Sequence, residues 1–162
     1  MGKKPTKAAD NIYCQKRLQA ALTDYRFNSR EKTAEMMNMS LSQLTEYELG
    51  TCKRIPPESV CLMAELYNAP DLRSYYCHYQ CPIGAIDIHP VYSEQLEGIT
   101  LNILAEMNML DRLKNRLIEI AADGQITDDE EADFNKILEN LDGISKRAQE
   151  LKVYAEKNRK KR

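Results

Sequence analysis

SREKTAEMMNMSLSQLTEYELG, residues 29–50, predicts two short helices joined by a tight turn. The Ser29 hydroxyl can cap the first helix, and Asn38 tolerates the left-handed conformation that ends a helix. Ser40 can cap the second helix, and Gly50 can end it. The inward face of this second helix is expected to comprise Leu41, Leu44, Tyr47 and Leu49. Helix, short turn and helix form one supersecondary unit.

Helices are also predicted on both sides of this unit. Residues 11–24 place Ile12, Leu18, Ala21, Leu22 and Tyr25 at helical spacing, with Lys16 and Arg17 outside it. These two cations are either solvated surface or phosphate contacts. Pro57 suits the first turn of a fourth helix that continues through Tyr67, and Asp71 is expected to cap a fifth helix that reaches Tyr76.

Several residues at fixed positions carry a resemblance to a known family: Ser29, Ala34, Asn38, Ser40, Leu44, Glu48 and Gly50. In this register the chain resembles the phage-repressor-like, or Xre, family of helix-turn-helix regulators from about Asn11 to Tyr76. The resemblance implies an all-α, five-helix lambda-repressor-like domain at 11–76 that binds double-stranded DNA. The family's usual turn glycine is Asn38 here.

The resemblance also implies which side chains meet DNA. Leu41, Ser42 and Glu46 would face bases, and the expected phosphate contacts are Arg30, Ser40, Gln43, Lys53 and Arg54. Glu46 can accept from a cytosine amine and Leu41 can touch a thymine methyl group, but no Arg or Asn of this helix reaches a purine edge. Glu46 and Glu48 make the helix acidic, which departs from a typical base-reading surface.

Composition and charge favour one binding half and one scaffold half. The 162 residues are 43% hydrophobic and 30% charged, which suits a folded protein. Residues 1–76 carry 11 Lys and Arg against 9 Asp and Glu, whereas residues 92–156 carry 7 against 15. Phosphate would attract the first half weakly and repel the second. With no apolar run of membrane-spanning length and no secretory signal, a cytoplasmic location without membrane contact is expected.

Five cysteines raise the question of a metal or redox site. An odd number in a reducing compartment argues against a disulfide framework. Cys77, Cys81 and His78 could converge on Zn²⁺, but a second cysteine pair is missing, and packing of the thiols at a domain junction is the favoured alternative. No cofactor is therefore expected. Residues 77–91 contain Cys and Pro and are predicted to be a linker.

Residues 92–156 predict a long antiparallel helical hairpin. Two series of apolar residues recur at alternating steps of three and four, and each series would form one seam of the hairpin. The first series is interrupted at Glu106. Gly124 should end the first helix, and Thr127 with Glu130 should form a capping box for the second. Asp123, Gly124, Ile126 and Glu130 also fit the second half of a calcium loop, but a hairpin turn is favoured because Glu119 and Ala121 would occupy the first and third ligand positions, and Ala cannot coordinate an ion.

Surplus apolar residues on this hairpin predict a homodimer. Leu101, Leu104, Met107, Ile118, Leu138 and Val153 lie outside the seams, and they need either a second copy or the amino-terminal helices as a partner. The expected interface residues are Leu96, Ile99, Ile103, Leu110, Leu117, Phe134, Ile137, Leu141 and Leu151. Residues 1–10 and 157–162 are expected to be a basic arm and a basic tail.

Two functions fit these features. The first is a sequence-specific DNA-binding regulator, most plausibly a repressor, that acts as a dimer. The alternative is a protein-interaction module that keeps the fold but binds another regulator. An enzyme is not expected, since His78 and His89 are the only histidines and no nucleophile, acid and base stand together.

Overall fold

A computed structural model describes residues 8–91 and 95–159, and within them all regular secondary structure is helical. The expected all-α class is therefore confirmed for this part of the chain. Most of the basic arm, and residues 160–162 of the basic tail, lie outside the described residues. No helix in the described ranges has both the length and the apolar character needed to cross a membrane.

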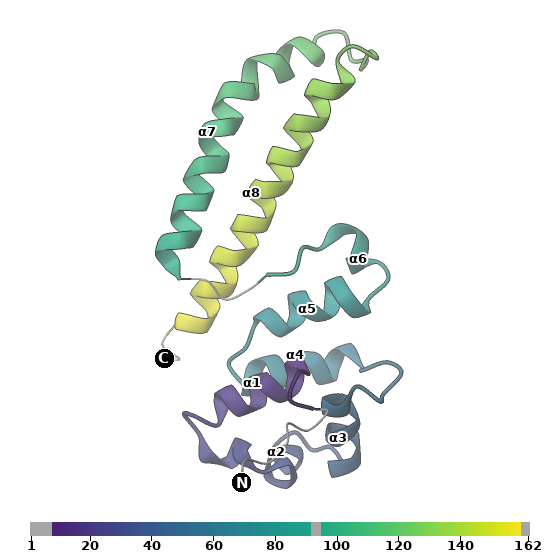
Figure 1. Cartoon of the computed structure of the whole chain (residues 1–162), viewed down its shortest axis with the longest axis vertical. Helices are drawn as coiled ribbons and strands as arrows, with labels where there is room; N and C mark the ends of the chain where they lie inside the picture. Colours follow the sequence, from purple (N-terminus) through teal and green to yellow (C-terminus); the bar gives the residue numbers. More distant parts are fainter. Residues whose placement is uncertain (1–7, 92–94, 160–162) are drawn as a thin grey trace. The chain divides into compact units, whose positions relative to one another are not determined.

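The chain divides into two compact units, residues 1–90 and 91–162. The helices of the first unit are α1 (Ile12–Ala20), the 3₁₀ turn η1 (Tyr25–Asn28), α2 (Arg30–Met36), α3 (Leu41–Leu49), α4 (Pro57–Leu66), α5 (Asp71–Gln80) and α6 (Gly84–Asp87). The second unit contains α7 (Leu96–Ile120) and α8 (Glu131–Asn158), which lie side by side in Figure 1.

Local capping residues set the helix ends around α2 and α3. The Ser29 hydroxyl accepts from the Lys32 amide at 3.3 Å, as a one-way cap. Asn38 adopts φ 50° in the turn, and Gly50 ends α3 at φ 67°. Asn11 caps α1, accepting from the Tyr13 amide at 2.9 Å. Each of these bonds joins residues close in sequence, so the sequence alone could place them.

The core of the first unit is formed by side chains from all its longer helices. Its buried members include Tyr13, Ala20, Phe27, Met37, Tyr47, Ile55, Val60, Met63, Ala64, Tyr67, Ala69, Leu72 and Tyr76. Phe27 and Tyr67 meet edge to face with ring centroids 5.5 Å apart. Burial of these aromatic rings draws η1 onto α4 and so helps to fix the start of α2.

The inward face of α1 differs from the predicted one. Tyr13, Cys14, Arg17 and Ala20 are buried, whereas Leu18, Leu22 and Tyr25 are 47%, 86% and 72% exposed. The helix ends at Ala20, so Leu22 and Tyr25 do not continue its periodicity. Lys16 forms an ion pair with the buried Asp71, so it is not a free surface cation.

The α5 helix is longer than expected, and its first residue has another role. It runs to Gln80 and so includes Cys77 and His78, which were expected in a linker. Asp71 is its first residue rather than a cap, and no side chain caps this helix. The carboxylate of Asp71 instead joins α5 to α1 through Lys16.

The α7–α8 pair buries only part of the predicted seams, with a polar break at Glu106. Towards the end of α8 the buried residues are Glu150 and Val153, which lie outside the seam, whereas Leu151 of the seam is 39% exposed. Ile99, Ile120 and Ile137 are buried, and the Asn140 amide donates to the Glu106 carbonyl at 3.1 Å and to its carboxylate at 2.7 Å. Asn140 thus supplies the polar partner for the interruption that the sequence shows at Glu106. Such a buried polar pair favours one register of the two helices over a shifted one.

Several residues that were predicted at the dimer interface are instead buried within the single chain or only partly exposed. Ile99 and Ile137 are fully buried in the single chain, so they close the α7–α8 pair and are not available to a second chain. Leu96, Leu141 and Leu151 are about two-fifths exposed, at 40%, 40% and 39%. Four other residues of the expected interface are half-buried, namely Ile103, Leu110, Leu117 and Phe134. Val153, expected on a surplus face, is buried.

The turn between α7 and α8 forms through its own side chains. Gly124 adopts φ 73°, and the Gln125 amide donates to the Asp123 carboxylate at 3.0 Å. The Thr127 amide and hydroxyl both donate to the Glu130 carboxylate, at 3.2 and 2.7 Å. The predicted capping box does not form at the start of α8, because Glu130 is the N-cap residue of that helix and no side chain caps it; the Thr127–Glu130 bonds hold the turn before it.

Candidate nucleic-acid interface

The α3 helix has one buried face and one exposed face. Leu44, Tyr47 and Glu48 point into the first unit, at helical steps of three and one. The outer face carries the three residues expected to meet bases, which are Leu41, Ser42 and Glu46, and all three are exposed. The Leu41 side chain is 42% exposed, so it does not belong to the inward face where its spacing had also placed it.

A reciprocal cap forms the start of α3. The Gln43 amide donates to the Ser40 hydroxyl at 3.1 Å, and the Ser40 amide donates to the Gln43 side-chain oxygen at 3.0 Å. Both residues were expected at phosphate. In the free protein the Gln43 side chain occupies the Ser40 amide, so a phosphate oxygen would have to replace it there.

A buried ion cluster holds the inner face of α3. Glu48 has no exposed surface and accepts from Arg17 Nε at 2.5 Å, Arg17 Nη2 at 3.0 Å and Arg30 Nε at 2.6 Å. Arg17 also donates to the Phe27 carbonyl at 2.6 Å. The cluster therefore connects α1, η1, α2 and α3, which fixes the orientation of α3 within the unit.

The charges of the cluster compensate one another. Burial alone would raise the pKa of Glu48, but the hydrogen bonds from Arg17 and Arg30 outweigh it, so its pKa lies below the ordinary value. For Arg17, burial would lower the pKa, and the Glu48 carboxylate raises it above the ordinary value. Glu48 thus stays ionised and paired. Of the two acidic residues expected on the α3 surface, only Glu46 is therefore exposed.

This cluster bears on two predicted roles. Arg30 was expected at phosphate; its Nε donates to Glu48 at 2.6 Å and its side chain is 32% exposed, so its contact with phosphate stays a prediction. Arg17 is 4% exposed, so it is neither a solvated cation nor a phosphate contact. The spacing Leu44, Tyr47, Glu48 already placed the carboxylate on the buried face, and this was the signal in the sequence that pointed to a buried pair.

Two exposed cations follow the other end of α3. Lys53 and Arg54 lie in the loop after Gly50, and both remain exposed as predicted for phosphate contacts. The loop is held by the Cys52 thiol, which donates to the Arg54 carbonyl at 3.1 Å. These two cations therefore stand where an anion can reach them.

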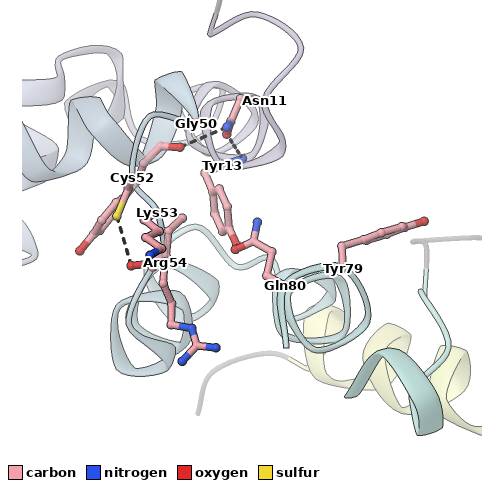
Figure 2. Close-up of a pocket in the computed structure, with 10 residues that line it drawn as sticks. Asn11, Tyr13, Gly50, Cys52, Lys53, Arg54, Tyr79 and Gln80 are labelled. Atoms are coloured by element: carbon pink, nitrogen blue, oxygen red, sulfur yellow. Dashed lines mark hydrogen bonds between the residues drawn. The ribbon is translucent and has the colours of Figure 1, made fainter. Parts of the chain in front are cut away.

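A cavity of about 800 Å³ lies beside this loop (Figure 2). It is lined by Asn11, Tyr13, Tyr47, Gly50, Cys52, Lys53, Arg54, Ile55, Tyr79 and Gln80. Asn11 donates to the Tyr47 carbonyl at 3.1 Å, and the Tyr13 hydroxyl donates to the Gln80 side-chain oxygen at 3.2 Å. The first bond holds the start of α1 against the end of α3, and the second holds it against the end of α5. The cavity wall is mixed polar and apolar, with its cationic charge on the loop.

The expected DNA contacts fall at the two ends of α3. The Ser40 amide is at its start, and Lys53 and Arg54 follow its end. An α-helix with its side chains is about 10–12 Å across, which fits a major groove about 12 Å wide. The structure thus leaves the outer face of α3 exposed between a capped amino terminus and a cationic loop.

The alternative metal site is not assembled. His78 Nδ1 lies 2.6 Å from the Ile88 carbonyl and donates to it, since a carbonyl only accepts. Among residues 8–91 and 95–159, no group of three or more His, Cys, Asp or Glu side chains is arranged to hold a metal ion. Cys77 and Cys81 therefore lack the further ligands that a structural zinc site needs.

Comparison of the chain with known protein families, curated protein sequences and solved structures found no match. The functional interpretation therefore depends on the residues and geometry described above.

Proposed function

We propose that this chain is a sequence-specific DNA-binding transcriptional regulator, a repressor, that acts as a dimer through α7 and α8. In this proposal residues 11–76 form a lambda-repressor-like helix-turn-helix domain of the Xre type, and α7 and α8 form an antiparallel hairpin for dimerisation. The observation that carries it is the exposed outer face of α3, which the Arg17–Glu48–Arg30 cluster orients from behind.

Base contacts would come from Leu41, Ser42 and Glu46. Glu46 can accept a hydrogen bond from a cytosine amine, and Leu41 can contact a thymine methyl group. The Ser42 hydroxyl lies 3.4 Å from the Glu46 carboxylate, so the two would meet DNA as a unit. This set offers modest discrimination, and affinity has to come in larger part from phosphate contacts.

Phosphate contacts would come chiefly from Lys53 and Arg54, with the Ser40 amide at the opposite end of α3. Arg30 is left out of this set, because binding phosphate would remove one of the partners of the buried Glu48. Cations that contact phosphate position the protein and make affinity fall with salt, but they do not read sequence.

Selection of binding sites from a random DNA pool tests the proposal directly, with the full chain as bait. An enriched sequence is expected, and Ser42→Arg should change which bases are enriched without abolishing binding. Enrichment of no sequence would contradict the proposal. An unchanged preference in Ser42→Arg would contradict the assignment of the α3 outer face.

Salt titration of the same complex tests the phosphate contacts. Lys53→Ala should weaken binding to all sequences and lower the slope of log affinity on log salt by about 0.9. Arg112→Ala is the matched control, since Arg112 is an exposed cation of α7 in the second unit. Equal effects of the two substitutions would show that Lys53 acts only through net charge.

Dimerisation is supported by the unequal flanks of the α7–α8 pair. Helical periodicity places Leu104 and Met107 on the same flank of the pair as Leu138 and Leu141, and these side chains are 51%, 55%, 46% and 40% exposed. The opposite flank carries the Asn140–Glu106 hydrogen bond and the ion pair between Arg116 and Asp133, 3.0 Å apart. A second copy is the simplest cover for the apolar flank.

Sedimentation equilibrium gives the mass in solution and tests this part of the proposal. The wild-type chain should be a dimer, and Leu104→Glu should shift it toward the monomer because a carboxylate would be buried at the interface. Leu22→Glu is the control, since Leu22 is exposed outside the pair. A wild-type monomer at micromolar concentration would contradict the dimer.

The alternative is a protein-interaction module, and the same apolar flank is the observation that favours it. A monomeric chain that enriches no DNA sequence but keeps this flank exposed would support binding to another protein. Leu104→Glu would then weaken that complex, whereas Lys53→Ala would leave it intact.

A further inference from the structure

Two cations in the loop after α3 are not neutralised within the chain. In residues 8–91 and 95–159, Lys53 and Arg54 form no ion pair, and both residues are exposed. Arg17 and Arg30 of the same unit differ, because both bind the carboxylate of Glu48. The charges of Lys53 and Arg54 therefore remain available to an anion from outside the chain.

These two cations line the cavity of about 800 Å³ that lies beside the loop. No Asp or Glu is among the described residues that line it. Figure 2 shows Arg54 on one side of this space and Tyr13 with Gln80 on the other. The Gln80 side-chain oxygen accepts from the Tyr13 hydroxyl at 3.2 Å, so the nitrogen of the same amide is left to donate to a ligand. The cavity thus offers an anion both positive charge and a hydrogen-bond donor.

A second cavity adjoins the first at Arg54 and Gln80, which line both. It has a volume of about 360 Å³, and its wall is mostly apolar. The other residues that line it are Pro57, Tyr76, Cys81, Pro82 and Ile83. Ile83 is 75% exposed, so an apolar group that covered it would remove hydrocarbon surface from water. The two cavities together therefore offer a cationic end and an apolar end.

The apolar end is formed before any ligand binds. Gly84 packs so closely on the last turn of α5 that a Cβ there would collide with the Cys77 carbonyl oxygen. The His78 ring donates to the Ile88 carbonyl at 2.6 Å. These two contacts hold α6 along α5 (Figure 1) and so fix the position of Ile83. A site that is already formed costs a ligand less ordering free energy.

We propose that the two adjoining cavities bind one small organic carboxylate with a short apolar body, and that this ligand releases the chain from DNA. The carboxylate pairs with the Arg54 guanidinium, whose planar fork matches two carboxylate oxygens. Lys53 adds a second positive charge, and the Gln80 amide adds a donor. The apolar body covers Ile83 and lies against Tyr76. A volume of about 360 Å³ is at the lower end of the range for small-molecule sites, about 300–1,000 Å³, so this body is short.

The release from DNA rests on the proposed function, in which Lys53 and Arg54 bind phosphate. One guanidinium cannot pair with the ligand carboxylate and with a DNA phosphate through the same nitrogen atoms at once. The ligand and DNA therefore compete, and each weakens binding of the other by the same factor. The ligand site itself does not depend on DNA binding and can be measured without DNA.

Isothermal titration of the full chain without DNA tests the ligand site, with octanoate as the probe. Octanoate should bind saturably, at one site per chain. Acetate has the head alone and octanol has the apolar body alone, so each should bind at least about tenfold more weakly. Arg54→Gln should weaken octanoate binding by a similar factor, whereas Arg112→Ala, which removes an exposed cation of α7, should leave it unchanged.

Two exposed isoleucines of the same segment provide a matched pair for the apolar end. Ile83 lines the smaller cavity, whereas Ile86 is 83% exposed and lines neither cavity. Ile83→Ser should weaken octanoate binding about fivefold or more, and Ile86→Ser should leave it unchanged. Because both side chains are exposed, both variants should fold, which circular dichroism checks. No saturable octanoate binding, or equal effects of the two substitutions, would overturn the proposal.

Competition with the DNA sequence enriched by site selection tests the release. Octanoate should displace this DNA from the wild type and from Ile86→Ser at the same concentration, and Ile83→Ser should need about fivefold more. Octanoate that binds the chain but leaves bound DNA in place would overturn the release while DNA binding stands. Enrichment of no DNA, with octanoate still bound through Arg54 and Ile83, would instead contradict the proposed function while the ligand site stands.

Discussion

Replacing Glu48 by Gln should destabilise the first unit strongly, although the two side chains have nearly the same shape. Glu48 is fully buried and accepts three hydrogen bonds from Arg17 and Arg30. Glu48→Gln keeps the shape but removes the charge, which leaves the Arg17 guanidinium, 4% exposed, without a counter-ion. Removing one partner of a buried pair costs about 3–5 kcal/mol, so we expect the free energy of unfolding to fall by about 3 kcal/mol or more.

Removing both charges should cost much less. In Arg17→Met with Glu48→Leu no buried ion remains, and apolar groups fill the space of the pair. One donor is still lost, because Arg17 also donates to the Phe27 carbonyl, and the Arg30 side chain, which is 32% exposed, loses Glu48 but can be hydrated. An unmade hydrogen bond of this kind costs about 1 kcal/mol, so the double variant should lie within about 1–2 kcal/mol of the wild type.

Urea unfolding followed by tyrosine fluorescence measures these differences in the first unit, where seven of the nine tyrosines lie. Glu46→Gln is the matched control, because Glu46 is exposed on the same helix and its neutralisation should change stability by less than about 0.5 kcal/mol. Equal small effects of Glu46→Gln and Glu48→Gln would refute the reasoning. A double variant as unstable as Glu48→Gln would refute the argument that the unpaired charge causes the loss.

Three further outcomes follow from the structure. The folded-state pKa of Glu48 lies below its ordinary value of 4.5. The stability that ionised Glu48 contributes to the first unit is therefore present above pH 4.5 and is lost as the pH falls through the folded-state pKa. Urea midpoints measured at decreasing pH should show this loss in the wild type but not in Glu48→Gln. Gly84→Ala should cost about 1–3 kcal/mol in urea unfolding, since its Cβ would meet the Cys77 backbone and displace the segment after α5. Asn140→Leu should destabilise the α7–α8 pair by about 1–3 kcal/mol because Glu106 loses its partner, whereas adding Glu106→Leu should restore stability, as thermal unfolding by circular dichroism would show.

The ends of the helices around α3 could be predicted because their signals are local. Ser29, Asn38, Ser40 and Gly50 act on backbone groups within a few residues of themselves, and the structure places each cap and left-handed residue as the sequence predicted. The buried part of the α7–α8 seam was predictable for a similar reason, since a period of three and four residues follows from helix geometry alone.

The burial of charge was not predicted, although part of its signal was present. Arg17 and Glu48 look like surface residues by type, and the first predicted helix was extended to Leu22 and Tyr25, which turned its apolar face away from Arg17. The actual helix stops at Ala20, and its inner face follows Tyr13, Cys14 and Arg17. An error in one helix boundary therefore changed the expected role of a buried cation.

The sequence by itself determined the all-α class seen in residues 8–91 and 95–159, the capped helices on either side of the turn at Asn38, and the break at Glu106 in the second unit. These features depend on backbone geometry and on residues within one or two turns of each other. Only the tertiary structure decided that Glu48 pairs with Arg17, 31 residues away, that Asn140 bonds to Glu106, and that Gly84 packs on Cys77. Those contacts join segments whose approach depends on the packing of whole helices, and no local pattern specifies which partner a buried charge or a missing side chain will meet.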